Sequence, residues 1–272
     1  MSAFILKIIA CVTMALDHVG YTLTSVPELR MIGRIAFPIF AYMIAFGYRK
    51  TSDPYKYMLR VIVTGVISEY FFDIYFFGRI TGNHNNVMLT LALGLLAITF
   101  TDNLRGKLKG AASVLAFLPA VMIAYSADVL NSDYGTLGVL LVILYYFFGG
   151  KYAVMENEPE NTPRNRMIRA LLITIITVGF GFRYYIIYAA ESVVFSICSA
   201  LPFLPAVIRS APAFPTGNHA IQAWASLAVV FILLYNGKRG VEIKNKVWRK
   251  VYQYSFYAFY PVHIFVLYLI FR

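Results

Sequence analysis

An acidic residue and a histidine stand side by side in the first apolar segment of the chain, where ionisable side chains are uncommon. Asp17 and His18 both lie well inside the apolar stretch 4–24. A charged side chain at the centre of a membrane helix costs roughly 2.5–3.5 kcal/mol, so such residues usually mark a site. Histidine takes up and releases protons near neutral pH, which suits general base catalysis. The pair therefore predicts a proton-transfer site, with a buried structural pair as the alternative.

Two further acids are candidates to complete this site. Glu69 and Asp73 are four residues apart in an apolar stretch, so they share one face of a helix. Neighbouring residues on a helix point about 100° apart, so Asp17 is not expected to orient His18 directly. We expect His18 to pair with an acid of another helix, such as Glu69 or Asp73. For these two acids, a salt bridge to Arg34 and a role in catalysis are equally open.

The composition of the chain is typical of an integral membrane protein. The 272 residues are 60% hydrophobic and only 14% charged, against about 25% charged in soluble proteins. The fold class is therefore an all-α integral membrane protein, one polytopic bundle of about nine to ten helices over residues 1–272. The stretch 190–208 contains two prolines and is expected to be re-entrant or peripheral, with a tenth span as the alternative. The other spans are expected near 4–24, 32–48, 57–77, 87–101, 112–126, 135–149, 168–188, 221–236 and 252–271.

Basic residues predict the orientation of the chain. Lys and Arg gather in the connections 49–60, 101–111, 149–169 and 236–250. Since cytoplasmic loops carry an excess of Lys and Arg, the N-terminus is expected in the cytoplasm of a multi-pass cell membrane protein. The net charge of +11 is then an orientation signal and a contact with the lipid bilayer, so no nucleic acid partner is indicated. The two cysteines lie in apolar segments, and no metal-binding motif is present.

This orientation groups the polar residues on two sides of the membrane. Glu69, Asp73 and the connections holding Asn86 and Asp133 fall on the outer side, and His263 lies near the middle of the last span. Tyr257, Tyr260 and His263 recur every three residues, a face that either lines the site or packs. A basic inner face suits an anionic, phosphate-bearing donor such as an acyl-CoA. Candidate residues for the donor are Arg34, Arg49, Lys50, Arg60, Lys238 and Arg239.

Several blocks of the sequence resemble the TraX family of membrane proteins. They appear in the family's order and cover most of the chain. The blocks are LKIIACVTMALDHVG (6–20), IGRIAFPIFAYMIAFGYRKT (32–51), ISEYFFD (67–73), DYGTLGVLL (133–141), LYNGKRG (234–240) and FYAFYPVHIFVL (256–267).

The resemblance implies an activity. The TraX family is named for a conjugal-transfer protein that N-acetylates pilin, and it is similar to the wider superfamily of transmembrane acyltransferases. By this resemblance, acetyl-CoA or another acyl-CoA is the donor, and the acceptor is a peptide, a pilin, a glycan or a small metabolite. His18 is then the expected base, with Asp17 beside it. The further candidates are Glu69, Asp73 and His263 for catalysis, and Asn86, Asp133 and Tyr260 for substrate binding.

Three functions follow from these observations. The first is an acyl-CoA-dependent N- or O-acetyltransferase that serves an amine or hydroxyl at the outer side of the membrane. The second is a proton-coupled transporter or exporter of a polar solute, in which the same residues relay protons. The third is a non-enzymatic maturation partner of a pilus or secreted peptide. Consumption of acyl-CoA separates the first from the other two.

Overall fold

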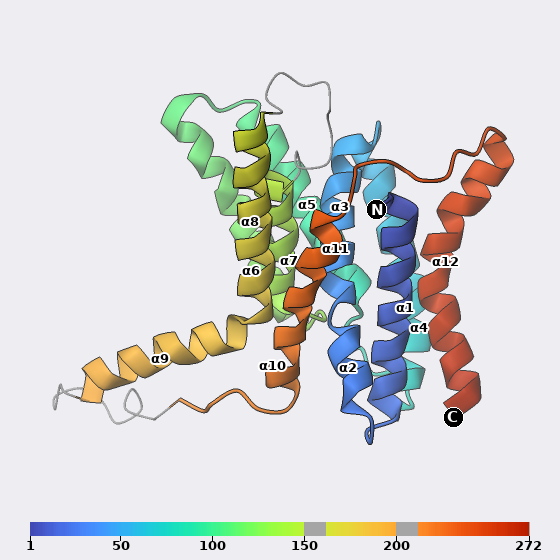
Figure 1. Cartoon of the computed structure of the whole chain (residues 1–272), viewed down its shortest axis with the longest axis horizontal. Coiled ribbons are helices and arrows are strands. Elements are labelled where there is room, and N and C mark those ends of the chain that lie inside the picture. The colour runs from blue at the N-terminus through green and yellow to red at the C-terminus, as the bar shows by residue number, and fades with distance from the viewer. Residues whose placement is uncertain (150–161, 200–211, 272) are drawn as a thin grey trace.

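The protein is a single bundle of helices (Figure 1). The computed structural model describes residues 1–149, 162–199 and 212–271, which form helices and no β-strand. We call the end of the bundle that holds the N-terminus the N end, and the opposite end, where the C-terminus lies, the C end (Figure 1). The α-helices are α1 (Ala3–Thr22), α2 (Pro27–Gly33), α3 (Ala36–Lys50), α4 (Pro54–Phe77), α5 (Val87–Arg105), α6 (Phe117–Val129), α7 (Gly135–Leu144), α8 (Pro163–Gly181), α9 (Arg183–Ser199), α10 (Asn218–Ile221), α11 (Ala228–Leu233) and α12 (Lys246–Phe271).

The all-α membrane class is confirmed, but nine to ten spans is an overestimate. Within the described residues, five helices are long and apolar enough to cross a membrane, or six if a bent pair forms one span. Helix α4 has 24 residues but carries Lys56, Arg60, Glu69 and Asp73, and it is not among them. The apolar stretches expected near 135–149 and 221–236 fold as shorter helices. The five are Ala3–Thr22, Pro27–Lys50, Val87–Arg105, Ala112–Val129 and Lys246–Phe271.

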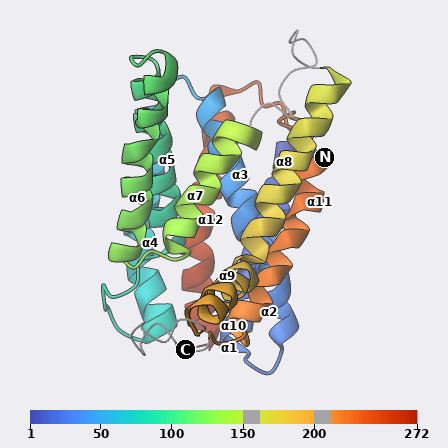
Figure 2. The same ribbon diagram turned by 90° about the vertical axis from the view of Figure 1, so that its left-hand side faces the viewer.

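The span expected near 168–188 is broken. Helix α8 ends at Gly181, and the chain turns by 73° into α9, which leaves the bundle at the C end (Figures 1 and 2). Gly181 lies so close to Ser226 that an added Cβ would sit 2.2 Å from its hydroxyl oxygen. Such a bent pair is either a broken span or a re-entrant segment. Of the stretch 190–208, expected to be re-entrant or peripheral, the structure describes helix up to Ser199, and residues 200–208 lie outside the described part of the chain.

Local sequence signals fix where several helices begin. The side chain of Asp53 accepts a hydrogen bond from the Lys56 amide, 2.9 Å away, and Pro54 follows at the first position of α4. The side chain of Asn86 does the same for the Met88 amide at the start of α5, also at 2.9 Å. These caps satisfy amide groups that a helix leaves open at its N-terminus. The Asn86 cap also places this residue opposite Glu69 of α4.

Helix α3 runs through the middle of the bundle (Figure 2). Ten of its residues are buried, including Phe37, Tyr42 and Tyr48. A helix that is apolar on all sides is stable only when other helices surround it, as α1, α5, α7 and α11 do here. This central helix fixes the relative positions of the elements that carry the polar residues.

Candidate active site

Two histidines from opposite ends of the chain meet inside the bundle. Nδ1 of His18 on α1 lies 2.8 Å from Nε2 of His263 on α12, and each residue is 8% exposed. The ring planes differ by 12° and the ring centroids are 4.9 Å apart, so the rings meet edge to edge in nearly one plane. The expectation that His18 pairs with Glu69 or Asp73 is therefore wrong.

The hydrogen bonds determine which ring nitrogens carry protons. Nδ1 of His263 lies 2.8 Å from the carbonyl oxygen of Phe259, and a carbonyl oxygen can only accept. In the neutral ring, Nδ1 of His263 is thus the donor and Nε2 the acceptor. Nδ1 of His18 must then donate to this Nε2, because one nitrogen of the pair has to supply the hydrogen. The lone pair of neutral His18 is left on Nε2, which makes no hydrogen bond to the described residues.

Aromatic residues hold this pair in place. The Tyr75 hydroxyl donates to the carbonyl oxygen of His18 at 3.0 Å and lies 2.6 Å from the Thr22 hydroxyl. The rings of Phe76 and Tyr260 lie edge-on to His18, with centroids 5.2 and 6.4 Å away. Tyr260 is 4% exposed, and its hydroxyl hydrogen-bonds to the backbone of Val87. A base in such surroundings is shielded from water and held in one orientation.

Asp17 faces away from His18 and forms ion pairs with two arginines. Its carboxylate lies 3.2 Å from Nη1 of Arg30 and 2.9 Å from Nη2 of Arg34. The expectation that Asp17 does not orient His18 directly is confirmed. A Cβ at Gly33 would lie 2.3 Å from the Asp17 Cβ, so only glycine allows α2 to approach α1 this closely. Asp17 therefore ties α2 to the helix that carries His18.

Arg30 is a residue that the sequence interpretation missed. It stands four residues before Arg34, a spacing that puts both side chains on one helical face and could have indicated a shared acidic partner. The possible salt bridge of Arg34 to Glu69 or Asp73 does not form, because Arg34 contacts Asp17 instead. Arg34 also lies away from the other basic residues that were expected to bind the donor.

Tyr134 is a second missed residue, and it contacts Arg34. The Arg34 guanidinium donates to the Tyr134 hydroxyl, and the Tyr134 ring stacks on Phe37 with centroids 3.8 Å apart. Burial raises the pKa of the Tyr134 phenol, although the charge of Arg34 opposes this shift. The hydroxyl therefore stays protonated at neutral pH. The backbone φ of +68° is uncommon for a tyrosine, and strain of this kind occurs often at functional sites.

The two acids of α4 make local contacts to the connection before α5. Asp73 is 1% exposed and accepts hydrogen bonds from the amides of Thr81 and Gly82, at 2.7 and 3.3 Å. One carboxylate oxygen of Glu69 accepts from the amide of Asn86, 3.1 Å away, and from its side chain. Asn86, expected to bind substrate, is 1% exposed and acts as a helix cap and as a partner of Glu69.

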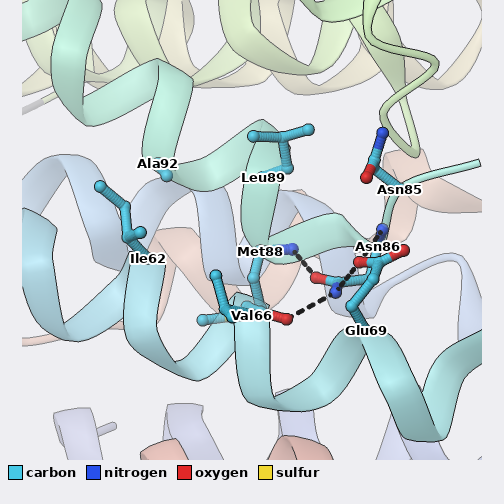
Figure 3. A pocket seen from close by; sticks show the side chains of 9 residues that line it. Ile62, Val66, Glu69, Asn85, Asn86, Met88, Leu89 and Ala92 are labelled. Carbon is cyan, nitrogen blue, oxygen red and sulfur yellow. Dashed lines mark hydrogen bonds between the residues drawn. The ribbon is translucent and has the colours of Figure 1, made fainter. Parts of the chain in front are cut away.

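Glu69 also lies at the polar end of a pocket between α4 and α5 (Figure 3). The pocket has a volume of about 230 Å³, and its other walls are mostly apolar, with Ile62, Val66 and Leu89. The second carboxylate oxygen of Glu69 is buried and has no hydrogen-bond partner among the described residues. Asp133 lies in the connection between α6 and α7, with a carboxylate oxygen 4.0 Å from Nε2 of His84.

The basic candidates lie toward the N end, apart from Arg34. Arg49 donates to the Tyr146 carbonyl, and Lys50 donates to the Gly237 carbonyl at 2.9 Å. Arg239 lies close enough to Lys50 and Lys7 for their charges to repel, and Lys238 is exposed beside it. Arg60 hydrogen-bonds to the Tyr257 hydroxyl. The described residues include no group of three or more His, Cys, Asp or Glu that could hold a metal ion.

The fold and the histidine pair define a helical membrane protein with a buried candidate base. Residues 2–271 match the family described as TraX protein, so the chain belongs to the TraX family, and the resemblance is confirmed. Over 285 residues it is 26% identical to the probable fimbrial assembly protein FimC, serogroup H1, of Dichelobacter nodosus, which covers 98% of this chain and 94% of that protein.

A second relative matches part of the chain. The uncharacterized protein RP591 of Rickettsia prowazekii (strain Madrid E) is 28% identical over 148 residues, or 52% of this chain and 53% of that protein. No solved structure matches the chain.

Proposed function

We propose that the protein is an integral membrane acyltransferase that moves an acyl group, in the first instance acetyl, from acyl-CoA to an amine or hydroxyl. The observation that carries the proposal is the free lone pair on Nε2 of His18. His263 holds the opposite nitrogen of His18 protonated through the 2.8 Å contact. A histidine oriented in this way by a second group is the arrangement that general base catalysis requires.

The reaction needs one base that acts twice. Nε2 of His18 accepts the proton of the acceptor amine or hydroxyl while the acceptor nitrogen or oxygen attacks the thioester carbonyl. The carbon–sulfur bond then breaks, and the imidazolium of His18 returns the proton to the departing CoA thiolate. The products are an amide or ester and free CoA. His263 is a positioning residue in this scheme, because it contacts His18 and no reacting atom.

The proposal places the N end in the cytoplasm. Basic residues support this orientation. Lys50 ends α3, Lys107 follows α5 and Arg239 lies between α11 and α12, and all three are exposed. The connection between α11 and α12 lies at the N end (Figure 1). Lys50 and Arg239, whose charges lie close enough to repel, form an anionic-ligand surface that suits the phosphates of CoA. His18 lies fifteen residues along α1 from its first residue, so the acyl arm must extend roughly 22 Å into the bundle at 1.5 Å per residue.

The similarity to a fimbrial assembly protein bears on the acceptor. FimC of Dichelobacter nodosus is named for fimbrial assembly, and the match covers nearly the whole of both chains. A pilus subunit or another surface protein is therefore the acceptor that we favour, through its terminal amine or a side-chain hydroxyl. The same similarity favours a second candidate function, a non-enzymatic partner in pilus assembly.

Binding of acetyl-CoA to the protein in nanodiscs tests the proposal. Calorimetry should show saturable binding that weakens in Lys50→Gln and Arg239→Gln and stays unchanged in the matched control Lys107→Gln. ATP serves as a control ligand for binding through phosphates alone. A folded protein that binds no acyl-CoA would refute the acyltransferase proposal and favour the assembly partner or a proton-coupled transporter.

A further inference from the structure

A second pocket is lined by residues of the connection between α6 and α7 and of the start of α9. The bend between α8 and α9 lies toward the C end (Figures 1 and 2). The volume of the pocket is about 420 Å³. Charged and polar residues line much of it, among them His84, Asp128, Ser132, Tyr134, Arg183 and Tyr184. Water occupies about 30 Å³ per molecule in the liquid, so the pocket has room for an organic group and not only for a single ion.

Arg183 is the buried cation of this pocket. The residue is 8% exposed, and no acidic side chain of the described residues lies within ion-pair distance of it. Its guanidinium donates to the Phe180 carbonyl oxygen at 2.9 Å and lies 4.3 and 4.6 Å from the ring centroids of Phe180 and Tyr184. These contacts offset part of the cost of burying the charge, but they supply no counter-ion.

Tyr134 lies close to Arg183 and to a second arginine, Arg34. The charges of Arg34 and Arg183 both act on this phenol, and Arg34 donates to it. Nε of Arg34 is buried and has no hydrogen-bond partner among the described residues. Arg183 and Tyr134 therefore line the pocket, and Arg34 hydrogen-bonds to Tyr134 from behind this lining. Arginine is well suited to oxyanions because its planar fork matches carboxylate and phosphate oxygens.

We propose that this pocket binds the oxyanion, phosphate or carboxylate, of a small organic ligand or lipid headgroup through Arg183 and Tyr134, while Arg34 orients the Tyr134 hydroxyl. The exposed Asp128 also lines the pocket, where its carboxylate accepts from the Thr136 amide at 2.8 Å, and it would face the uncharged or cationic part of the ligand. The site goes beyond the proposed acyl transfer, because binding here involves no bond cleavage. Arg34 nevertheless connects it to Asp17, and through α1 to His18.

Thermal unfolding of the purified full chain tests this site. Inorganic phosphate and acetate are titrated at constant ionic strength against chloride, in detergent and in phosphatidylcholine nanodiscs. A parallel sample uses nanodiscs that contain phosphatidylglycerol. Saturable stabilisation by a free anion indicates a soluble ligand, whereas stabilisation by phosphatidylglycerol alone indicates a lipid headgroup. Either result supports the site if it depends on Arg183.

Three substitutions test whether the anion binds in this pocket. Arg183→Gln should weaken the apparent affinity for the effective anion at least about tenfold, which corresponds to about 1.4 kcal/mol. Tyr134→Phe removes only the hydroxyl, keeps the stacked ring, and should weaken binding in the same direction. Arg79→Gln, a change of an exposed arginine at the same end, should have no effect. The proposal is overturned if no anion or anionic lipid stabilises the protein, or if Arg183→Gln and Tyr134→Phe respond as Arg79→Gln does.

Discussion

Nδ1 of His18 and Nε2 of His263 are 2.8 Å apart, although 245 residues separate the two in sequence. This contact joins the first described helix to the last and aligns two imidazole rings edge to edge. Because Nδ1 of His263 donates to the Phe259 carbonyl oxygen, Nε2 of His263 is the acceptor, and Nδ1 of His18 is the donor to it. The relation of these two residues underlies the predictions about catalysis.

Replacement of His263 should slow acyl transfer, and it should do so most strongly when the new side chain has no atom that can accept a hydrogen bond from His18. His263→Gln retains a side-chain oxygen that can accept from Nδ1 of His18, whereas His263→Phe retains only the ring shape. We expect activity to fall in the order wild type, His263→Gln, His263→Phe, with a loss of roughly 10²-fold for His263→Phe. The measurement is kcat for CoA release against pH. A merely structural role for His263 would lower the yield of folded protein but leave the pH profile of the two variants unchanged.

The protonation pattern of the histidine pair is directly observable. In protein labelled with ¹⁵N at histidine, the Nε2 resonance of His18 should report a nitrogen without hydrogen, and both Nδ1 nitrogens should carry hydrogen. His263→Phe should remove this preference at His18, because the acceptor is gone. A hydrogen on Nε2 of His18 in the wild-type protein at neutral pH would contradict the proposed base.

Asp17 should contribute to stability through its two arginine partners. Asp17→Asn leaves the charges of Arg30 and Arg34 uncompensated, with side chains only 17% and 13% exposed. Loss of one partner of a buried pair typically costs about 3–5 kcal/mol, so a clear decrease in Tm is expected. Asp53→Asn removes an exposed pair with Lys56 and should change Tm little. Equal effects of the two substitutions would show that the Asp17 pairs do not stabilise the fold.

Gly33 should be intolerant of any side chain. Gly33→Ala places a methyl group 2.3 Å from the Asp17 Cβ, so α2 and α1 must move apart. We expect a lower Tm and weaker acyl transfer, since α1 carries His18. Gly179→Ala is the matched control, because an added Cβ there meets nothing within 4 Å. It should leave Tm unchanged or raise it slightly, by the better helix propensity of alanine. A Tm for Gly33→Ala equal to that of Gly179→Ala would contradict the close packing.

The sequence was sufficient to predict the polar residues of the site but not their partners. Asp17, His18 and His263 stand out because ionisable residues in apolar segments are costly. Their pairing depends on how α1, α2 and α12 pack, and no local sequence pattern indicates that His18 contacts another histidine. The helical angle between neighbouring residues did predict that Asp17 and His18 act separately. No pattern in the sequence indicated that the Asp73 carboxylate accepts hydrogen bonds from the amides of Thr81 and Gly82.

The spans were harder to predict than the fold class. Composition alone indicates a membrane bundle, but hydropathy does not show that the span expected near 168–188 breaks at Phe182. The signal was present in Gly179 and Gly181, since glycine commonly marks the end of a helix. The strained Tyr134 had no comparable signal, because its φ depends on the turn between α6 and α7 and on stacking against Phe37.

The most direct test of the central claim is transfer of a radiolabelled acetyl group from acetyl-CoA. The reconstituted protein is incubated with a membrane and surface-protein fraction from cells that lack it, so that the acceptor need not be known. We expect the label to appear on an acceptor with the wild-type protein and with His219→Gln, an exposed histidine outside the site. His18→Gln should reduce the transfer by roughly 10²–10⁴-fold. Full transfer by folded His18→Gln would contradict the assignment of the base, and no transfer by the wild-type protein would contradict the enzyme itself.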